Sequence, residues 1–193
     1  MRRFDYPVYL DLSGVLVLVV GAGPVAARKV AGLAAAGARI RVVAVEVSPL
    51  LDRSLVAEVR QRAFAVEDLE GVRLVVTATG LRDVDAEVAA AATAAGLWVN
   101  AADQPDDCSF ILPAIARNGP LTVAVSTGGA SPALARRLRD HAGGLLTDEV
   151  VALAEQLAAE RAQVRSEGGS TEAVDWSPAI DPVLPPVDDH PSV

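Results

Sequence analysis

Cysteine, histidine, lysine and aromatic residues are all scarce in this chain of 193 residues. The one cysteine, Cys108, excludes an intrachain disulfide framework and a metal site built from several cysteines. The two histidines, His141 and His190, have no partner at metal-ligand spacing, so we expect no bound metal ion. Aromatic residues make up 4% of the chain and hydrophobic residues 51%, so the core must be aliphatic.

Long hydrophobic runs are also missing. The longest segment without a charged residue, 118–135, is rich in Gly, Pro, Ser, Thr and Asn, which excludes a membrane-spanning helix there. Asp5 and Asp11 interrupt the N-terminal segment before any apolar core, so we expect no signal peptide. The expectation is a cytoplasmic protein with no membrane partner.

Positive charge is too sparse to bind nucleic acid. The net charge is −8 at pH 7, and the segment 166–193 contains acidic residues but no lysine or arginine. The rest of the chain is close to neutral and has no basic stripe, so nucleic acid is not expected as a partner. The same segment is rich in proline, a composition that predicts a loosely ordered tail.

Short apolar runs alternate with helical patterns over the first half of the chain. The run 15–20 (VLVLVV) is β-branched and ends at a glycine, which is typical of a buried parallel strand. This alternation predicts an α/β fold with a Rossmann-like doubly wound parallel sheet. The expected strands are 15–20, 39–45, a weak one near 63–66, 72–78 and 97–100. The expected helices are 23–37, one that begins at Ser48-Pro49, and 83–95.

The pattern changes after residue 113. The segment 121–125 alternates with period two, as a strand does, and Ser131 before a proline marks the start of a helix over 131–141. A second helix is expected over 147–165, so a small α+β segment and a short helical C-terminus follow the sheet. The predicted parts are a Rossmann domain over 1–113, a strand-plus-helix segment over 114–145, a C-terminal helix over 146–165 and an acidic tail over 166–193.

The strongest local signal is the segment 21–26 (GAGPVA), which fits the dinucleotide-binding pattern G-x-G-x-x-A between a strand and a helix. Gly21 permits the tight turn, Gly23 lets a pyrophosphate approach the backbone, and Ala26 is small enough for the helix to pack on the sheet. The helix N-terminus would attract the anion. We predict a bound dinucleotide; the alternative is a glycine turn with a structural role alone.

Three further residues follow strands at the same edge of the predicted sheet. Glu46 has the spacing of an acid that binds the ribose hydroxyls of NAD, and its charge would repel the 2′-phosphate of NADP. Thr77 and Thr79 follow the fourth strand, where small residues let a cofactor pass. The alternatives are a solvated glutamate and an ordinary turn at a strand end.

Asp103 is the candidate catalytic base. It follows the fifth strand directly, so it is held more firmly than Asp106 and Asp107 in the turn beyond it. Its alternative role is to cap or turn the loop. The acids in the first turns of the helix 83–95 are interpreted as partners of the helix dipole and N-terminus: Asp83, Asp85 and Glu87.

The loop 126–132 (STGGASP) joins a strand to a helix and combines hydroxyl groups, glycines and a helix N-terminus. These features suit an anion, and a substrate with several carboxylates would fit the arginines that follow on the helix. The alternative is a capped turn followed by a solvated basic face.

Taken together, these motifs resemble the precorrin-2 dehydrogenase/sirohydrochlorin ferrochelatase family, the N-terminal module of siroheme synthases. The resemblance is specific because ordinary Rossmann proteins lack its SFILP and STGGASP blocks. The matching blocks fall in order along the chain: YPVYLDL (6–12), VVGAGPVAARK (19–29), TAT (77–79), VNAAD (99–103), SFILP (109–113) and VAVSTGGASP (123–132).

The resemblance implies an enzyme that oxidises precorrin-2 to sirohydrochlorin with NAD and, in many members, inserts Fe²⁺ as a substrate to make siroheme. It also implies a homodimer in which the segment 114–145 exchanges between subunits. The general base falls on Asp103 by motif match. The implied cofactor contacts are Pro24, Val25, Val45 and Glu46, and the implied substrate contacts are Asn100, Ser126, Thr127 and Gly128.

Two departures from the family leave the iron-insertion step open: the helical C-terminal part is shorter than usual, and we expect no methyltransferase domain. Two alternatives to the dehydrogenase also stay open, a non-catalytic dinucleotide- or tetrapyrrole-binding module and a chelatase that does not use NAD. The first would have no use for Asp103. The candidates to hold substrate carboxylates are Arg117, Arg136, Arg137 and Arg139.

Overall fold

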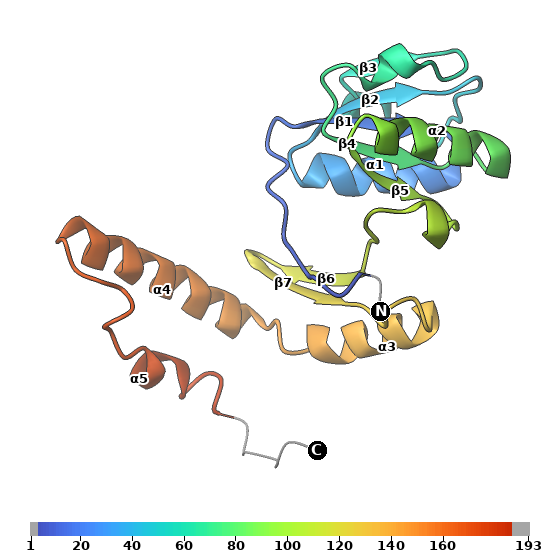
Figure 1. Ribbon diagram of the computed structural model, residues 1–193. Helices are drawn as coiled ribbons and strands as arrows, with labels where there is room; N and C mark the ends of the chain where they lie inside the picture. The colour runs from blue at the N-terminus through green and yellow to red at the C-terminus, as the bar shows by residue number, and fades with distance from the viewer. Residues whose placement is uncertain (1–3, 187–193) are drawn as a thin grey trace. The chain divides into compact units, whose positions relative to one another are not determined.

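The computed structural model describes residues 4–186, so His190 and the end of the acidic tail lie outside the described residues. The chain forms two compact units, which divide between Leu112 and Pro113 (Figure 1). The first unit contains the glycine-rich motif, and the second contains the loop 126–132. Each unit is described by itself below.

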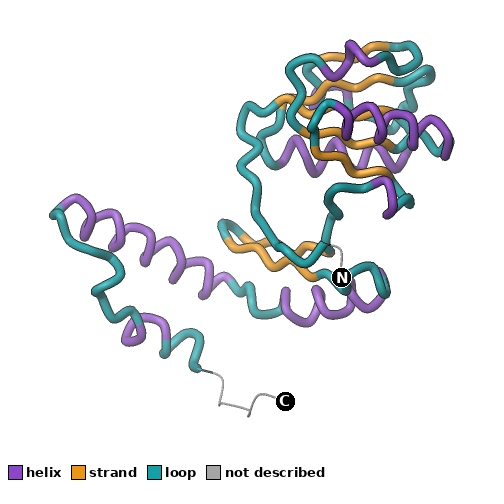
Figure 2. The backbone as a smooth tube through the Cα atoms, in the orientation of Figure 1, coloured by secondary structure: helices purple, strands orange, loops and turns teal. Residues whose placement is uncertain are grey.

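The first unit is built on a five-stranded parallel sheet with helices on both faces (Figure 2). Its strands are β1 (Leu16–Val20), β2 (Arg39–Val43), β3 (Glu58–Arg60), β4 (Leu74–Thr77) and β5 (Trp98–Ala101). Its helices are α1 (Pro24–Ala35) and α2 (Arg82–Ala94), with 3₁₀ turns η1 (Arg53–Leu55), η2 (Val66–Leu69) and η3 (Pro105–Asp107). The strand order β3-β2-β1-β4-β5 reverses direction between β1 and β4, which confirms the predicted Rossmann-like α/β fold.

Aliphatic side chains fill both faces of the sheet, because successive residues of a strand point to opposite sides. On one face, Val17 and Val19 of β1 pack with Val30 of α1. On the other face, Leu18 of β1 packs with Val88 of α2. All five side chains are almost fully buried. The core is therefore the aliphatic one that the composition predicts.

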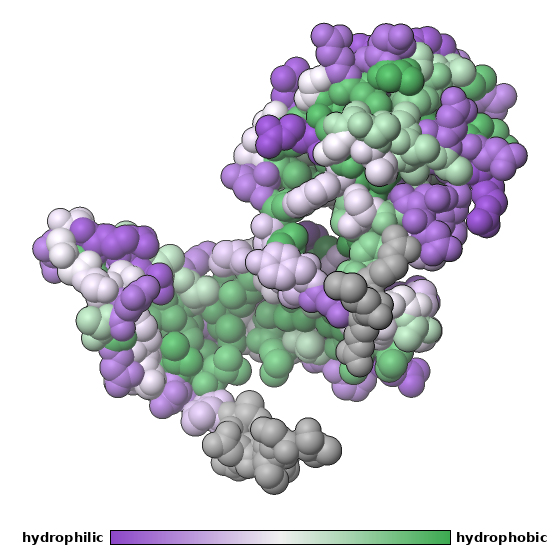
Figure 3. Space-filling model, viewed as in Figure 1, coloured by the Kyte–Doolittle hydropathy of each residue, from purple (hydrophilic) through white to green (hydrophobic). Residues whose placement is uncertain are grey.

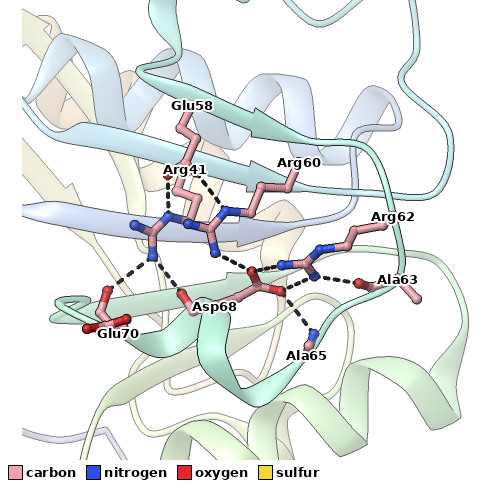
Figure 4. A network of polar contacts seen from close by, with 8 residues as sticks. All are labelled: Arg41, Glu58, Arg60, Arg62, Ala63, Ala65, Asp68 and Glu70. Carbon is pink, nitrogen blue, oxygen red and sulfur yellow. Dashed lines mark hydrogen bonds and ion pairs between the residues drawn. The ribbon is translucent and has the colours of Figure 1, made fainter.

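Charged side chains close the β2–β3 edge of the sheet (Figure 4). The fully buried Asp68 carboxylate accepts hydrogen bonds from Arg60 (2.6 Å) and Arg62 (2.6 and 2.7 Å). Glu58 pairs with Arg41 at 2.7 Å and with Arg60 at 2.6 Å. Burial by itself would raise the pKa of Asp68, but hydrogen bonds from Arg62, a backbone N–H and Arg60 outweigh it and lower the pKa to about 2.

Two elements of the first unit differ from the prediction. The sequence predicts a weak strand near 63–66, but β3 lies earlier, where Glu58 pairs with β2. Asp68 accepts the N–H of Ala65 (2.9 Å) and so stabilises the start of η2 where the strand was predicted. The helix predicted from Ser48 is also wrong, since its hydroxyl accepts the N–H two residues on (3.2 Å) in a local turn.

The second unit begins with an antiparallel hairpin and continues with helices. Its elements are β6 (Ala114–Asn118), β7 (Leu121–Val125), α3 (Pro132–Gly143), α4 (Asp148–Ser166) and α5 (Ser177–Ile180). The strand 121–125 and the two longer helices are confirmed, and Ser131 caps α3 by accepting the N–H of Leu134 (3.2 Å). The sequence predicted one strand in the segment 114–145, and the structure corrects this. The segment contains a second strand, β6, which pairs through its backbone with β7.

The second unit buries few of its own apolar side chains. Among its described residues, the buried hydrophobic ones are Ala135 of α3 and Leu153 of α4. Leu134 and Leu138, one turn apart on α3, are 50% and 46% exposed, and Leu145 is 59% exposed. Figure 3 shows apolar residues gathered over the viewed face of this unit. Because only two hydrophobic side chains, Ala135 and Leu153, are buried among its described residues, the unit lacks a core of ordinary size. Its hairpin would be at best marginally stable by itself.

Candidate active site

The glycine turn after β1 brings the ends of two neighbouring strands close to it. Gly21 has a φ of +102°, and its N–H donates to the carbonyl of Val43 on β2 (2.8 Å). A Cβ on Gly21 would meet the backbone of Ala78 just after β4, with the carbonyl carbon 2.7 Å away. Both the backbone conformation and the close approach therefore require glycine here.

Gly23 and the first turn of α1 form an open anion cradle. Gly23 is the N-cap residue, Pro24 occupies the first turn of the helix, and a Cβ on Gly23 would meet nothing within 4 Å. The first N–H groups of a helix have no intrahelical acceptor, and the helix dipole adds positive potential. Ala26 is fully buried against the sheet. This geometry fits the pyrophosphate of a dinucleotide.

A pocket of about 180 Å³ opens beside the Gly23 cradle. Since the strand order reverses between β1 and β4, it lies in the crevice where open α/β sheets bind ligands. Its lining comes from the start of α1, from the loop and first helical turn after β4, and from the loop after β5. These residues are Gly23, Pro24, Val25, Ala78, Thr79, Gly80, Asp85, Ala102 and Asp103.

Val45 and Glu46 lie past the end of β2, are exposed and do not line this pocket. The strands β2 and β4 flank β1 on opposite sides. A dinucleotide whose pyrophosphate lies at the end of β1 would extend one half toward Glu46 and the other half into the pocket.

Asp85 of α2 holds the loop that follows β4. Its Oδ1 accepts hydrogen bonds from the Thr77 hydroxyl, from the Thr79 N–H (3.0 Å) and from the Thr79 hydroxyl (2.9 Å). Thr77 is fully buried, which corrects its predicted contact with a cofactor, whereas Thr79 lines the pocket. The sequence predicted that Asp85 caps its own helix. Its carboxylate instead accepts hydrogen bonds from the loop after β4.

Asp103 lies in the loop after β5 in the left-handed conformation, with a φ of +58°. Aspartate and asparagine adopt this conformation more readily than most residues. Asp103 is exposed and lines the pocket together with Gly23, whereas Asp106 and Asp107 lie in η3 and do not. The loop therefore presents one of its three carboxylates to the pocket.

Lys29, the only lysine of the chain, supports the Asp103 loop and is a residue that sequence reasoning missed. Its ammonium donates to Asn100 Oδ1 (2.8 Å), and Asn100 Nδ2 donates to the carbonyl of Phe110 (3.1 Å). Asn100 is 6% exposed with both polar groups engaged, so its predicted substrate contact becomes a supporting role. Burial lowers the pKa of Lys29, and electrostatic interactions with Cys108 and Asp103 only partly offset this effect.

The hydroxyls of the loop 126–132 are engaged within the second unit. Ser126 Oγ accepts the N–H of Gly128 (3.1 Å), and Thr127 Oγ1 accepts the N–H of Ser131 (3.1 Å) and donates to its carbonyl (3.2 Å). Gly128 has a φ of +60°. The loop is a preformed turn at the N-terminus of α3, and its predicted substrate contacts stay predictions.

Two of the four predicted arginines lie together in the second unit. Arg117 of β6 and Arg139 of α3 line one shallow groove, where Arg139 donates to the carbonyl of Ile115 (3.2 Å). The Nε of Arg139 lies 2.6 Å from the carboxylate of Asp140. Arg136 is exposed on α3 and does not line this groove.

Two negative findings hold for residues 4–186. No helix in this range combines the length and the apolar character needed to cross a bilayer. No group of three or more His, Cys, Asp or Glu side chains within it is arranged to hold a metal ion.

Two family matches cover the whole sheet and part of the second unit. Residues 8–114 match the family described as putative NAD(P)-binding, a range that includes all five strands of the sheet. Residues 118–141 match the family described as the central part of sirohaem biosynthesis proteins, a range that includes β7 and most of α3.

Siroheme synthases are among the most similar curated proteins. The enzyme of Methylococcus capsulatus is 44% identical over 166 residues, which are 83% of this chain and 35% of that protein. The enzyme of Pseudomonas entomophila is 47% identical over 139 residues, 70% of this chain and 30% of that protein. The chain thus spans about a third of the length of these relatives.

A solved structure named SirC, precorrin-2 dehydrogenase, has the same fold. It matches with a TM-score of 0.66 and 29% identity over 95% of this chain and 90% of that one. These comparisons agree with the glycine turn, the crevice and the motif blocks. The chain belongs to the putative NAD(P)-binding family, and its resemblance to the precorrin-2 dehydrogenase/ferrochelatase module of siroheme synthases is confirmed.

Proposed function

We propose that this chain binds NAD along the carboxyl edge of its parallel sheet and oxidises precorrin-2 to sirohydrochlorin. The observation that carries the proposal is the pocket in which Asp103 lines the same space as the Gly23 cradle. The likeness to a precorrin-2 dehydrogenase structure over 95% of this chain supports the same reaction.

The cofactor would be held by groups at four strand ends. The first turn of α1 binds the pyrophosphate, with Pro24 and Val25 beside it. The Glu46 carboxylate accepts hydrogen bonds from the ribose hydroxyls. Its negative charge repels the 2′-phosphate of NADP, so the site should bind NAD in preference to NADP. The nicotinamide half enters the pocket, where Thr79 and Asp103 line its walls.

Bound NAD supplies the hydride acceptor. The oxidation removes two hydrogens from the substrate, one as a hydride and one as a proton. The Asp103 carboxylate lines the pocket and is open to solvent, so it can accept the proton and release it to water. Lys29 and Asn100 keep the Asp103 loop in place. We assign the substrate carboxylates to the loop residues Ser126, Thr127 and Gly128 and to Arg117, Arg136, Arg137 and Arg139.

An anaerobic absorbance assay with precorrin-2, with and without NAD, tests this function. We expect sirohydrochlorin to form only when NAD is present, with one NADH produced for each substrate oxidised. If no oxidation depends on NAD although NAD binds, the chain is a dinucleotide-binding module and the proposed reaction is wrong.

Iron insertion is a second activity of the proposal, suggested by the name siroheme synthase that the relatives carry. Fe²⁺ would be a substrate, and Asp103 would accept the pyrrole protons that the metal displaces. Adding Fe²⁺ to the completed anaerobic reaction tests it: siroheme should form faster than in a control without enzyme. If siroheme forms at the same rate with and without the enzyme, the chain has dehydrogenase activity but does not insert iron.

The two glycines of the cofactor turn should respond differently to alanine. Gly23→Ala adds a Cβ where the backbone is extended and space is open, so the free energy of unfolding should change by less than about 0.5 kcal/mol. The methyl group would occupy the approach of the pyrophosphate, so the Kd for NAD should rise at least about tenfold.

Gly21→Ala is the matched comparison. At a φ of +102° and against the Ala78 backbone, its Cβ should cost about 2–4 kcal/mol of unfolding free energy. Urea denaturation and calorimetric titration with NAD measure both variants. A Gly23→Ala protein that binds NAD as tightly as the wild type would contradict the assignment of the pyrophosphate site.

We also propose that two copies of the chain associate through the second unit. The exposed Leu134 and Leu138 on α3, together with the small internal core, support a partner that covers this face.

Leu138→Asp would place one negative charge from each subunit in the interface of a symmetric dimer, so the dimer Kd should rise at least about 100-fold. Light scattering measures the mass. Val66→Asp, on the exposed side of η2 in the first unit, should leave the dimer intact. A monomeric wild type would contradict the proposal.

A cytoplasmic location is part of the proposal. It is supported by the cysteine content: Cys108 is the one cysteine and is buried, so this chain has no intrachain disulfide that an oxidising compartment would have to form.

A further inference from the structure

The Asp85 side chain is a buried carboxylate in the wall of the proposed cofactor pocket. It is 2% exposed and lies in the first turns of α2. It lines the pocket together with Thr79, Gly80 and Asp103. Asp85 takes no part in the proposed proton transfer, and the sequence predicted only that it lies near the N-terminus of a helix.

The two oxygens of this carboxylate are in different situations. Oδ1 accepts all three hydrogen bonds, from the Thr77 hydroxyl and from the N–H and hydroxyl of Thr79. The group that holds the loop after β4 therefore does so through one oxygen, while the side chain also lines the pocket.

Holding the loop does not require a charge. An asparagine at this position would offer the same Oδ1 acceptor, and it would avoid the cost of burying a carboxylate without a cation beside it. The loop therefore explains the acceptor, and the N-terminus of α2 stabilises the negative charge only in part. A cation that comes and goes with the reaction would explain it.

The oxidised nicotinamide ring is such a cation, since it carries a positive charge that is lost on reduction. The strand order assigns the nicotinamide half to the side of β4 and β5, where Asp85 lies. We propose that Asp85 is a specificity-determining residue that strengthens binding of the oxidised cofactor over the reduced one. This inference rests on the proposed NAD-dependent function. It would load the site with NAD⁺ and let NADH leave.

Calorimetric titrations of Asp85→Asn with NAD⁺ and with NADH test the inference. The variant keeps the Oδ1 acceptor, so the loop should hold. The Kd for NAD⁺ should rise roughly tenfold while the Kd for NADH changes less than about twofold. The readout is a ratio of two affinities, which damage to the loop would not move, since a displaced loop weakens both cofactors alike.

Asp83→Asn is the matched control. Asp83 is an exposed acid in the same turn of α2 and does not line the pocket, so removing its charge should leave both Kd values unchanged. If Asp85→Asn unfolds, Asp85→Ser offers a smaller neutral acceptor with the same expected ratio. Equal weakening of both cofactors, or no change in either, would overturn the inference. A wild type that binds neither nucleotide would instead refute the proposed function.

Discussion

Replacing Asp103 with asparagine is expected to lower the rate of NAD-dependent precorrin-2 oxidation by about 10²–10⁴-fold, the range that a positioned base supplies. Asparagine tolerates the left-handed backbone at this position and has nearly the same volume, so the loop should keep its shape. The substitution removes only the group that accepts the proton. Single-turnover absorbance measurements at saturating NAD isolate this step from cofactor binding.

The control for this variant lies in the same loop. Asp107→Asn changes a carboxylate that does not line the pocket, so its rate should stay within about twofold of the wild type. The Kd of Asp103→Asn for NAD should also stay within about threefold, because the pyrophosphate cradle is untouched. Undiminished turnover by Asp103→Asn would remove this residue from the mechanism and favour another base or a water molecule.

The second large effect concerns stability. Asp68→Ala should lower the free energy of unfolding by about 3–5 kcal/mol, because it removes the counter-charge of Arg62 at a fully buried position and leaves Arg60 with Glu58 alone. Arg60 and Arg62 keep 29% and 45% of their side chains exposed, so partial rehydration favours the lower end of that range. Glu58→Gln, at a side chain that is 40% exposed, should cost less than about 1 kcal/mol. Urea denaturation at pH 7 measures both.

The same carboxylate predicts a pH dependence. The pKa of Asp68 falls from 3.8 to about 2 in the folded protein, so its contribution is complete above pH 3.8 and is lost as the pH falls toward 2. A shift of this size is worth about 2.5 kcal/mol. Because half of the Asp68 carboxyl groups are still ionised at pH 2, the difference in unfolding free energy between wild type and Asp68→Ala should narrow by about 2 kcal/mol between pH 7 and pH 2. A gap that stays constant with pH would mean that packing, and not the ion pairs, stabilises this edge.

Some features were predictable because they depend on residues adjacent in the chain. The turn at Gly21, the cradle at Gly23 and the cap at Ser131 follow from backbone conformation and hydrogen bonds within a few residues. The alternation of apolar runs and helical patterns determined the sheet, since a buried parallel strand must be apolar on both faces. Asp103 was a candidate because it directly follows the last predicted strand, at the edge of the sheet where open α/β sheets bind ligands.

Other features depend on which distant residues the fold brings together. The strand β3 formed at Glu58–Arg60, where its backbone pairs with β2. It did not form at the apolar residues near 63–66, because Asp68 accepts the N–H of Ala65 there and η2 begins. The strand β6 exists only through its pairing with β7.

The supporting residues of the site were decided in the same way, by tertiary structure. Asn100 and Thr77 became buried supports, Lys29 became a partner of Asn100 across 71 positions, and Asp85 turned from its own helix end to the loop after β4. Sequence alone determined where the backbone can bind a dinucleotide, because that depends on local geometry. Only the tertiary structure decided which polar groups face the pocket and which are consumed within the protein, because burial and hydrogen-bond partners are set by residues far away in the chain.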